Sequence, residues 1–241
     1  MVLSQRQKKI LEKIVKEHIH SALPVSSKFL CEKYNFGIAP ATMRIEMQRL
    51  TDQGYLYQPH TSAGRIPTDK GYRFFVDNLV REGYRDFMET KKKRIIEEIR
   101  EEMKNSVKLI QATSRVIVEN SSNLGMSYLL EEDILWKEGW KEVLSKPEFQ
   151  EGEITFDFIK MIEEFEEHIK DILPENSQET KVYIGKESPL SKSSEFSIIT
   201  ARFVCPGLDC KGVLAILGPK RMNYNKNISL INFLTHSLYQ V

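Results

Sequence analysis

Residues 40–67 read PATMRIEMQRLTDQGYLYQPHTSAGRIP, and this stretch decides the fold of the first part of the chain. Pro40 suits the first turn of a helix, Gly54 suits its C-terminal cap, and apolar side chains recur between them at helical spacing. Two short strand-like pieces, 55–57 and 65–66, then flank a loop of small and polar residues. The stretch therefore predicts a helix followed by a β-hairpin.

The neighbouring residues predict three more helices. A capping box at Ser4 starts a first helix, and Ser26 can cap a short second one. A tight turn at 35–37 joins the second helix to the third, which matches the plan of a helix-turn-helix, and the hairpin is then its wing. Because Thr68 can cap a fourth helix, residues 1–82 are predicted to form a winged helix-turn-helix domain.

The first part of the chain is basic, although the whole chain is nearly neutral at +1. Residues 1–85 contain 14 Lys or Arg and 8 Asp or Glu, a net charge of +6, which leaves −5 for the remainder. A basic domain followed by a mildly acidic one is typical of a protein in which only the first domain contacts nucleic acid.

The third helix is the candidate reader of DNA bases. With Met43, Met47 and Leu50 facing inward, the step of about 100° per residue turns other side chains outward or sideways. In a major groove, Arg can pair with guanine, Gln with adenine, and an aliphatic group can contact a thymine methyl. The alternative is an ordinary solvated helix face, but the preceding helix and the wing favour DNA binding. The expected DNA-facing residues are Ala41, Thr42, Arg44, Ile45, Gln48 and Arg49.

The wing tip combines small, polar and cationic residues, so its amides, hydroxyls and guanidinium can approach phosphates. Arg65 could equally enter a minor groove, and the alternative for the whole segment is a flexible hairpin turn. Lys70 and Arg73 add positive charge nearby and are candidates for contacts to the DNA backbone. The expected DNA contacts from the wing are His60, Thr61, Ser62, Gly64 and Arg65.

Residues 83–123 are highly charged, with apolar side chains at spacings of three and four. This pattern predicts one long amphipathic helix, from about 86 to 120, which acts as a connector. The helix would either pack on its own domain or form a dimerisation strut.

Residues 124–241 predict an α+β domain. A helix-rich stretch ends before Pro174, and three strand candidates follow at 182–184, 196–204 and 212–217. A turn-prone segment separates the last two, so they are expected to pair as antiparallel strands, and an amphipathic helix ends the chain. Helices on a small antiparallel sheet place this part in the α+β class.

Several classes of protein are excluded at this level. The sequence shows no signal peptide and no apolar run long enough for a membrane span, so a cytoplasmic protein with no membrane association is expected. Cys205 and Cys210, with Cys31 far away in the sequence, are expected to form a buried thiol pair and no metal site. No H-E-x-x-H pattern, phosphate-binding loop or other catalytic set occurs, so neither an enzyme nor a cofactor is expected.

The same residues point to a family. The stretch HTSAGRIPTDKGYR at 60–73, preceded by ATMR at 41–44 and GYL at 54–56, closely resembles the HrcA heat-shock repressors of bacteria. Three later segments resemble that family's C-terminal GAF-like domain: PEF at 147–149, IGKE at 184–187 and GPKRMNY at 218–224.

The resemblance implies a dimeric repressor that binds an inverted-repeat operator, called CIRCE, upstream of chaperone genes. It also implies a chaperonin as the partner that keeps the repressor active until heat shock. Family members commonly carry Ser at the position of Ala39 and Asn at that of Ile45, so the preferred operator can differ. The chain is shorter than the usual member, with the gap between Asn120 and Pro147, which implies a reduced GAF-like domain.

Two rival functions stay open at this point. The C-terminal half of such a regulator can sense a small-molecule ligand, so that DNA release follows ligand binding. Alternatively, the winged helix can be a protein-docking surface with no role on DNA, although the positive charge of residues 1–85 argues against this.

Overall fold

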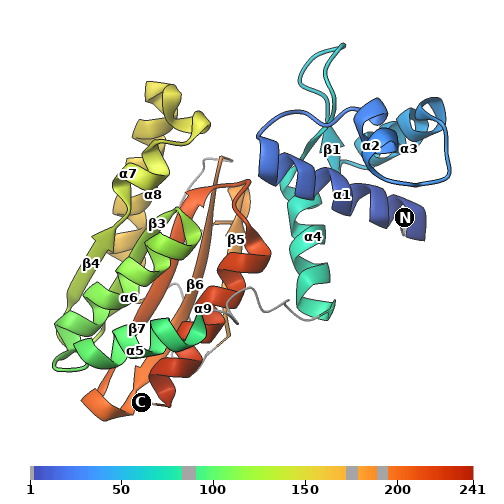
Figure 1. Ribbon diagram of the computed structural model, residues 1–241. Helices are drawn as coiled ribbons and strands as arrows, with labels where there is room; N and C mark the ends of the chain where they lie inside the picture. The colour runs from blue at the N-terminus through green and yellow to red at the C-terminus, as the bar shows by residue number, and fades with distance from the viewer. Residues whose placement is uncertain (1–2, 83–90, 172–178, 189–194, 241) are drawn as a thin grey trace. The chain divides into compact units, whose positions relative to one another are not determined.

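The computed structural model describes residues 3–82, 91–171, 179–188 and 195–240. The chain divides into two compact units, Met1–Gly83 and Tyr84–Val241. Both contain helices and antiparallel strands (Figure 1). None of the helices within the described ranges is both long and apolar enough to cross a membrane.

The first unit begins with three helices, α1 (Gln5–Ser21), α2 (Ser27–Lys33) and α3 (Pro40–Asp52). Strands β1 (Leu56–Tyr57) and β2 (Ile66–Pro67) follow, and helix α4 (Asp69–Glu82) ends the unit. The predicted caps are present: Ser4 and Gln7 form the capping box of α1, and the Ser26 hydroxyl accepts a hydrogen bond from the Phe29 amide. Ala39 provides no side-chain cap for α3, which begins at Pro40.

One apolar core joins the four helices and the hairpin. Helical spacing would also place Phe29 of α2 and Val80 of α4 on the inward faces, but these two side chains are 40% and 56% exposed. Burying such aliphatic and aromatic side chains contributes about 1.5–3 kcal/mol each to folding. The core residues of this unit include Ile10, Leu11, Ile14, Val15, Leu30, Met43, Met47, Leu50, Leu56, Tyr72, Phe75 and Val76.

The hairpin is antiparallel, with Leu56 opposite Pro67 and Tyr57 opposite Ile66. Its second strand is extended by a bridge in which Val25 and Arg65 exchange both backbone hydrogen bonds, at 2.9 and 2.8 Å. The segment before α2 is therefore fixed to the base of the wing.

The second unit contains a five-stranded antiparallel sheet in the order β4-β3-β7-β6-β5. The strands are β3 (Leu124–Leu129), β4 (Ile134–Glu138), β5 (Lys181–Ile184), β6 (Phe196–Cys205) and β7 (Cys210–Pro219). The described helices of this unit are α5 (Lys92–Glu102), α6 (Ser106–Ser121), α7 (Trp140–Leu144), α8 (Gly152–His168) and α9 (Tyr224–Tyr239), with short 3-10 turns at Pro147–Gln150, Gly185–Glu187 and Pro206–Leu208.

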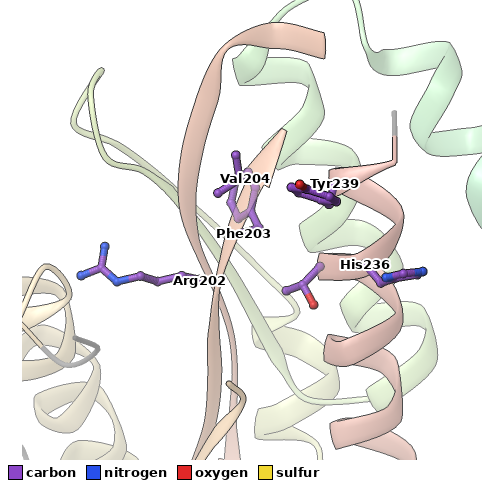
Figure 2. Close-up of a pocket in the computed structure, with 6 residues that line it drawn as sticks. Arg202, Phe203, Val204, His236 and Tyr239 are labelled. Carbon is purple, nitrogen blue, oxygen red and sulfur yellow. The ribbon is translucent and has the colours of Figure 1, made fainter. Parts of the chain in front are cut away.

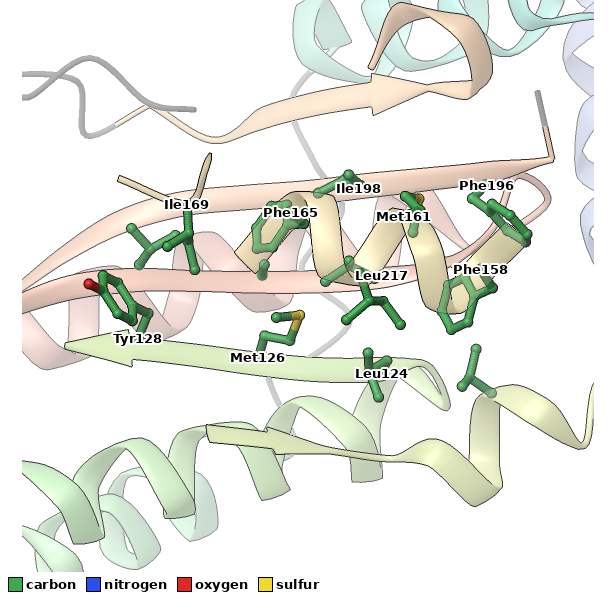
Figure 3. Packing of buried hydrophobic residues seen from close by; sticks show 14 of the residues in the cluster. Leu124, Met126, Tyr128, Phe158, Met161, Phe165, Ile169, Phe196, Ile198 and Leu217 are labelled. Atoms are coloured by element: carbon green, nitrogen blue, oxygen red, sulfur yellow. The ribbon is translucent and has the colours of Figure 1, made fainter. Parts of the chain in front are cut away.

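Helices cover both faces of this sheet. Helix α8 lies on one face, where Phe158, Met161 and Phe165 pack against alternate residues of β3, β6 and β7 (Figure 3). Helices α6 and α9 lie on the other face, and α5 packs on α6 (Figure 1). A small buried polar cluster joins α6 to the sheet, because the Ser127 hydroxyl lies 3.0 Å from that of Thr113 and accepts a hydrogen bond from Ser114 at 2.8 Å.

The prediction of a single helical connector is wrong. The described part of that segment forms two helices, because the chain leaves α5 at Met103 and Asn105 caps α6 by accepting a hydrogen bond from the Lys108 amide at 2.8 Å. Residues 86–90 of the predicted helix lie outside the described residues. Since α6 packs on β3, the segment is an integral part of the second unit and not a separate connector.

The strand prediction for the second unit is confirmed for three strands and incomplete for two. β5, β6 and β7 occur where expected, and β6 pairs with β7 in antiparallel register. The hairpin of β3 and β4, however, occupies residues that were expected to be helical after Gly125. The predicted apolar side of α8 also includes Phe156 and Ile159, which are exposed. Helix α8 ends at His168, earlier than the expected end near Pro174.

Candidate nucleic-acid interface

Helix α3 has one buried and one exposed side, as its spacing predicts. Met43, Met47 and Leu50 are buried in the core of the first unit. The exposed side includes Ile45, an isoleucine that keeps 54% of its surface open to solvent. All six residues that were expected to face DNA are exposed: Ala41, Thr42, Arg44, Ile45, Gln48 and Arg49.

A groove of about 610 Å³ lies between α3, the start of α2 and the wing loop. Three of the six outward residues of α3 line it, namely Arg44, Ile45 and Gln48. From the other elements it is lined by Ser26, Ser27, Gln58, Thr61, Ser62, Ala63, Gly64 and Arg65, together with Met47 of α3. The wing tip and the exposed side of α3 therefore face the same space, which is the arrangement that a helix in a DNA groove and a contact to the adjacent backbone require.

The shape of the wing loop is set by its own hydrogen bonds. The Gln58 side-chain amide donates to the carbonyls of Thr61 and Ala63, each at 2.9 Å. A Cβ atom added at Gly64 would lie 2.4 Å from the Val25 carbonyl oxygen, so the close approach of the α2 segment requires glycine here. Gly64 thus has a packing role in addition to the DNA contact that was expected of it.

Arg65 differs most from its expected role. Its side chain is 8% exposed and turns onto α3, where Nε donates to Thr51 Oγ1 at 3.1 Å and Nη2 donates to Gln48 Oε1 at 2.8 Å. Burial is the main cause that lowers the pKa of this guanidinium, and the positive charge of Arg44 lowers it further. In the structure the guanidinium is engaged on α3, and the contact with a phosphate or a minor groove that was expected of Arg65 stays a prediction.

The polar side chains of α3 differ in how firmly they are held. Gln48 Nε2 donates to Asp52 Oδ1 at 2.8 Å, and Arg49 pairs with the buried carboxylate of Glu46 at 3.0 Å. In contrast, no hydrogen bond or ion pair joins Arg44 to any residue that the structure describes. Arg44 is therefore the groove cation that is available for a ligand.

The two backbone candidates on α4 do not line the groove. The Lys70 ammonium donates to the Gln53 carbonyl at 2.8 Å and lies 4.4 Å from the centre of the Tyr55 ring. Arg73 pairs with Asp77 at 3.6 Å. His60, at the wing tip, is exposed but is also outside the groove lining.

Sequence reasoning missed several residues of this site. Ser26 was recognised only as a helix cap, and Ser27 and Gln58 not at all, although all three line the groove. Thr51 accepts a hydrogen bond from Arg65 and Asp52 accepts one from Gln48, and both lie on the same face of α3 as Gln48. A possible signal was the spacing of Gln48, Thr51 and Asp52, which places polar groups three and four residues apart on one helix face.

The second unit has a smaller hollow beside the end of β6. It is lined by Phe203, Val204, Tyr239 and three other residues of β6 and α9, and has a volume of about 150 Å³ (Figure 2). Arg202 points away from α9 and donates to the Lys170 carbonyl at 3.0 Å. Pockets for small molecules usually measure about 300–1,000 Å³, so this hollow gives no support to ligand sensing.

The cysteines of the second unit face each other across the β6–β7 hairpin. Cys205 and Cys210 are direct register partners, both are buried and both are free thiols. Burial is the main cause that raises the pKa of the Cys210 thiol to about 12, and the neighbouring Cys205 adds to the shift. Among the residues that the structure describes, no group of three His, Cys, Asp or Glu side chains is placed to hold a metal ion.

Two of the segments that resemble the HrcA family meet in the fold. The Arg221 guanidinium binds both carboxylate oxygens of Glu148, with the second contact at 3.0 Å. A bidentate pair of this kind fixes orientation as well as distance. The segments at 147–149 and 218–224 therefore hold each other in place.

Comparison with known proteins identifies the family. A model of the HrcA protein C-terminal domain matches residues 78–228. The heat-inducible transcription repressor HrcA of Acetivibrio thermocellus is 28% identical over 333 aligned positions, covering 97% of this chain and 95% of the relative. Since the chain has 241 residues, this relative contains segments with no counterpart here. HrcA of Natranaerobius thermophilus is 55% identical over 80 residues, covering 33% of this chain and 23% of the relative.

One solved structure shares the fold of the whole chain. The crystal structure of a hypothetical protein at 2.2 Å resolution covers 99% of this chain and 98% of its own, with a TM-score of 0.78 and 18% identity. That similarity shows the fold alone. Because the family model matches more than half of the chain, the protein belongs to the HrcA family.

Proposed function

We propose that the protein is a sequence-specific DNA-binding transcription repressor of heat-shock genes, and that Met1–Gly83 is its winged helix-turn-helix domain. The observation that carries the proposal is the shared groove, in which the exposed side of α3 and the wing tip face each other in a basic unit. The relatives in Acetivibrio and Natranaerobius, both named heat-inducible transcription repressors, support it.

In this proposal α3 enters a major groove. Arg44 pairs with a guanine edge, Gln48 with an adenine, and Ile45 contacts a thymine methyl. Ala41, Thr42 and Arg49 flank these contacts on the same exposed side. At the wing, the hydroxyls of Thr61 and Ser62 and the ring of His60 approach the DNA backbone, which fixes the register of the protein on the duplex.

Lys70 and Arg73 are secondary candidates for backbone contacts. Both already have a partner within the first unit. Ion pairs at the surface, such as that of Arg73 with Asp77, contribute only about 0–1 kcal/mol, so a phosphate can compete for Arg73. Lys70 donates to a neutral carbonyl, so its positive charge is also open to a phosphate.

The proposal extends to a homodimer on an inverted-repeat operator, since a two-fold symmetric protein binds half-sites related by inversion. The second unit then serves as a GAF-like regulatory and dimerisation domain, an interpretation supported by its antiparallel sheet with helices on both faces. A chaperonin is the proposed regulatory partner, and the cytoplasm is the proposed compartment, because the operator lies there.

Selection of bound duplexes from a random pool tests this function with the full chain. We expect enrichment of an inverted repeat and an affinity that falls steeply with salt concentration. Arg44→Ala removes a cation of the groove and should relax the selected sequence, whereas Lys16→Ala, which removes an exposed cation of α1 outside the groove lining, is the matched control and should not. Failure of the unaltered protein to enrich any sequence would rule out the proposed function.

A further inference from the structure

A chain of polar side chains links the wing to α3. Arg65 Nη2 donates to Gln48 Oε1 at 2.8 Å, and Gln48 Nε2 donates to Asp52 Oδ1 at 2.8 Å. A second bond, from Arg65 Nε to Thr51 Oγ1 at 3.1 Å, holds the guanidinium on the same helix. The wing and the exposed side of α3 are therefore connected through specific hydrogen bonds as well as through the apolar core.

This chain determines which way the Gln48 amide points. A guanidinium can only donate hydrogen bonds, and a carboxylate can only accept them. The oxygen of Gln48 must therefore face Arg65, and its nitrogen must face Asp52. One lone pair and one N–H of the amide stay unused, and Gln48 is exposed and lines the groove. These are the two groups that a glutamine uses to recognise the edge of adenine.

Arg65 itself is poorly placed to contact DNA. Its side chain is almost fully buried, and both of its backbone hydrogen-bonding groups are paired with Val25. A turn toward a phosphate would break two hydrogen bonds of a charged group and leave Gln48 without one of its two anchors.

We propose that Arg65 is a positioning residue. It holds the Gln48 amide in one orientation and thereby sets the base preference at the operator position that Gln48 faces, without contacting DNA itself. This inference rests on the proposed DNA-binding function and assigns to Arg65 an effect on sequence preference, where a phosphate contact would affect all sequences equally.

Arg65→Met is the main test, because methionine keeps an unbranched apolar stem and removes the donors. In the full chain, we expect discrimination at one base pair of each half-site to fall about tenfold or more. A lost phosphate contact would instead reduce the slope of log affinity against log salt concentration by about 0.9. Unchanged base preference together with such a reduced slope would overturn the proposal.

A double variant tests whether Arg65 acts through Gln48. Gln48→Ala alone should abolish the preference at that base pair, and Arg65→Met added to it should cause no further loss of discrimination. Independent, additive losses at two different base pairs would contradict the inference. Circular dichroism and thermal melting of each variant show whether the first unit is folded.

Two milder variants apply if Arg65→Met does not fold. Arg65→Lys keeps the positive charge but cannot reproduce the planar set of donors. Asp52→Ala leaves Arg65 intact and removes the acceptor at the other end of the amide; Asp52 is exposed. Both should weaken preference at the same base pair, and unchanged preference in both would overturn the proposal. If the unaltered protein selects a sequence but the variants do not differ from it, only the positioning role fails.

Discussion

The two units are stabilised in different ways. In the second unit, strands β3, β6 and β7 are buried almost throughout, because helices cover both faces of the sheet. In the first unit, each strand of the hairpin has two residues, and the wing is held mainly by hydrogen bonds from Gln58, Arg65 and Val25. Burial on both faces holds the sheet of the second unit, whereas the wing of the first unit is a short hairpin held by hydrogen bonds beside an apolar core.

The largest expected effect lies in the core of the second unit. Phe165→Ala removes a fully buried ring of α8 and should lower the free energy of unfolding by about 3–5 kcal/mol. Chemical denaturation measures this loss. Phe156→Ala, on the same helix but 69% exposed, is the control and should change stability by less than about 0.5 kcal/mol. Equal losses in both variants would contradict the packing of α8 described above.

The second effect concerns the frame of the wing. Gly64→Ala places a Cβ atom against the Val25 carbonyl, which the backbone must move to accommodate. We expect a loss of about 1–3 kcal/mol in stability, since overpacking has costs of this size, and a weaker affinity for DNA. Thermal melting and DNA titration measure the two effects. Gly152→Ala is the control, because its Cβ would meet no atom within 4 Å. Unchanged stability and DNA affinity in Gly64→Ala as well as in the control would refute the close contact between Gly64 and the Val25 carbonyl.

The third effect separates a free cation of α3 from a paired one. Arg44→Ala should relax base preference at one operator position by about 1–3 kcal/mol, since Arg44 lines the groove. Arg49→Ala, which breaks the pair with Glu46, should have a smaller effect on base preference. Competition between operator variants measures both, and a larger effect from Arg49 would reverse the roles assigned to them.

The smallest effect is a pH dependence in the second unit. Burial, and next the charge of Arg221, lower the pKa of Lys146 to about 8, against 10.5 for the ordinary side chain, while Glu148 opposes the shift. Between these two values Lys146 binds more protons in the unfolded chain than in the folded one, so its contribution to the stability of the folded state rises with pH, while the raised pKa of Cys210 acts in the opposite direction. Lys146→Met should remove this rise, whereas Lys141→Met, at an exposed position, should keep it. Denaturation at pH 8 and pH 10 measures the difference.

The sequence was most informative where signals are local. Capping residues, Pro40 and Gly54 placed the helices of the first unit, because each acts on the backbone next to it. The break between α5 and α6 also has a local signal, the cap at Asn105, but the regular apolar spacing across it favoured a single helix.

Two features depend on contacts that are distant in sequence. Strand β3 is buried on both faces, so it lacks the alternation of apolar and polar residues that identifies a half-buried strand. The direction of the Arg65 side chain follows from its pairing with Val25 and from acceptors on α3, and neither can be inferred from the composition of the loop. Seven of the twelve residues that line the groove could thus be named from the sequence, but the difference between contacting and supporting residues could not.

The free side chain of Ile45 has a consequence for how such a regulator diverges. Ile45 lines the groove and is anchored by no polar partner, whereas Gln48 is tied to Arg65 and Asp52. If α3 enters a major groove as proposed, a single replacement at position 45 alters DNA preference without breaking a hydrogen bond of its neighbours. A change at position 48 requires compensating changes on two elements, so new operator specificities should arise first at Ile45.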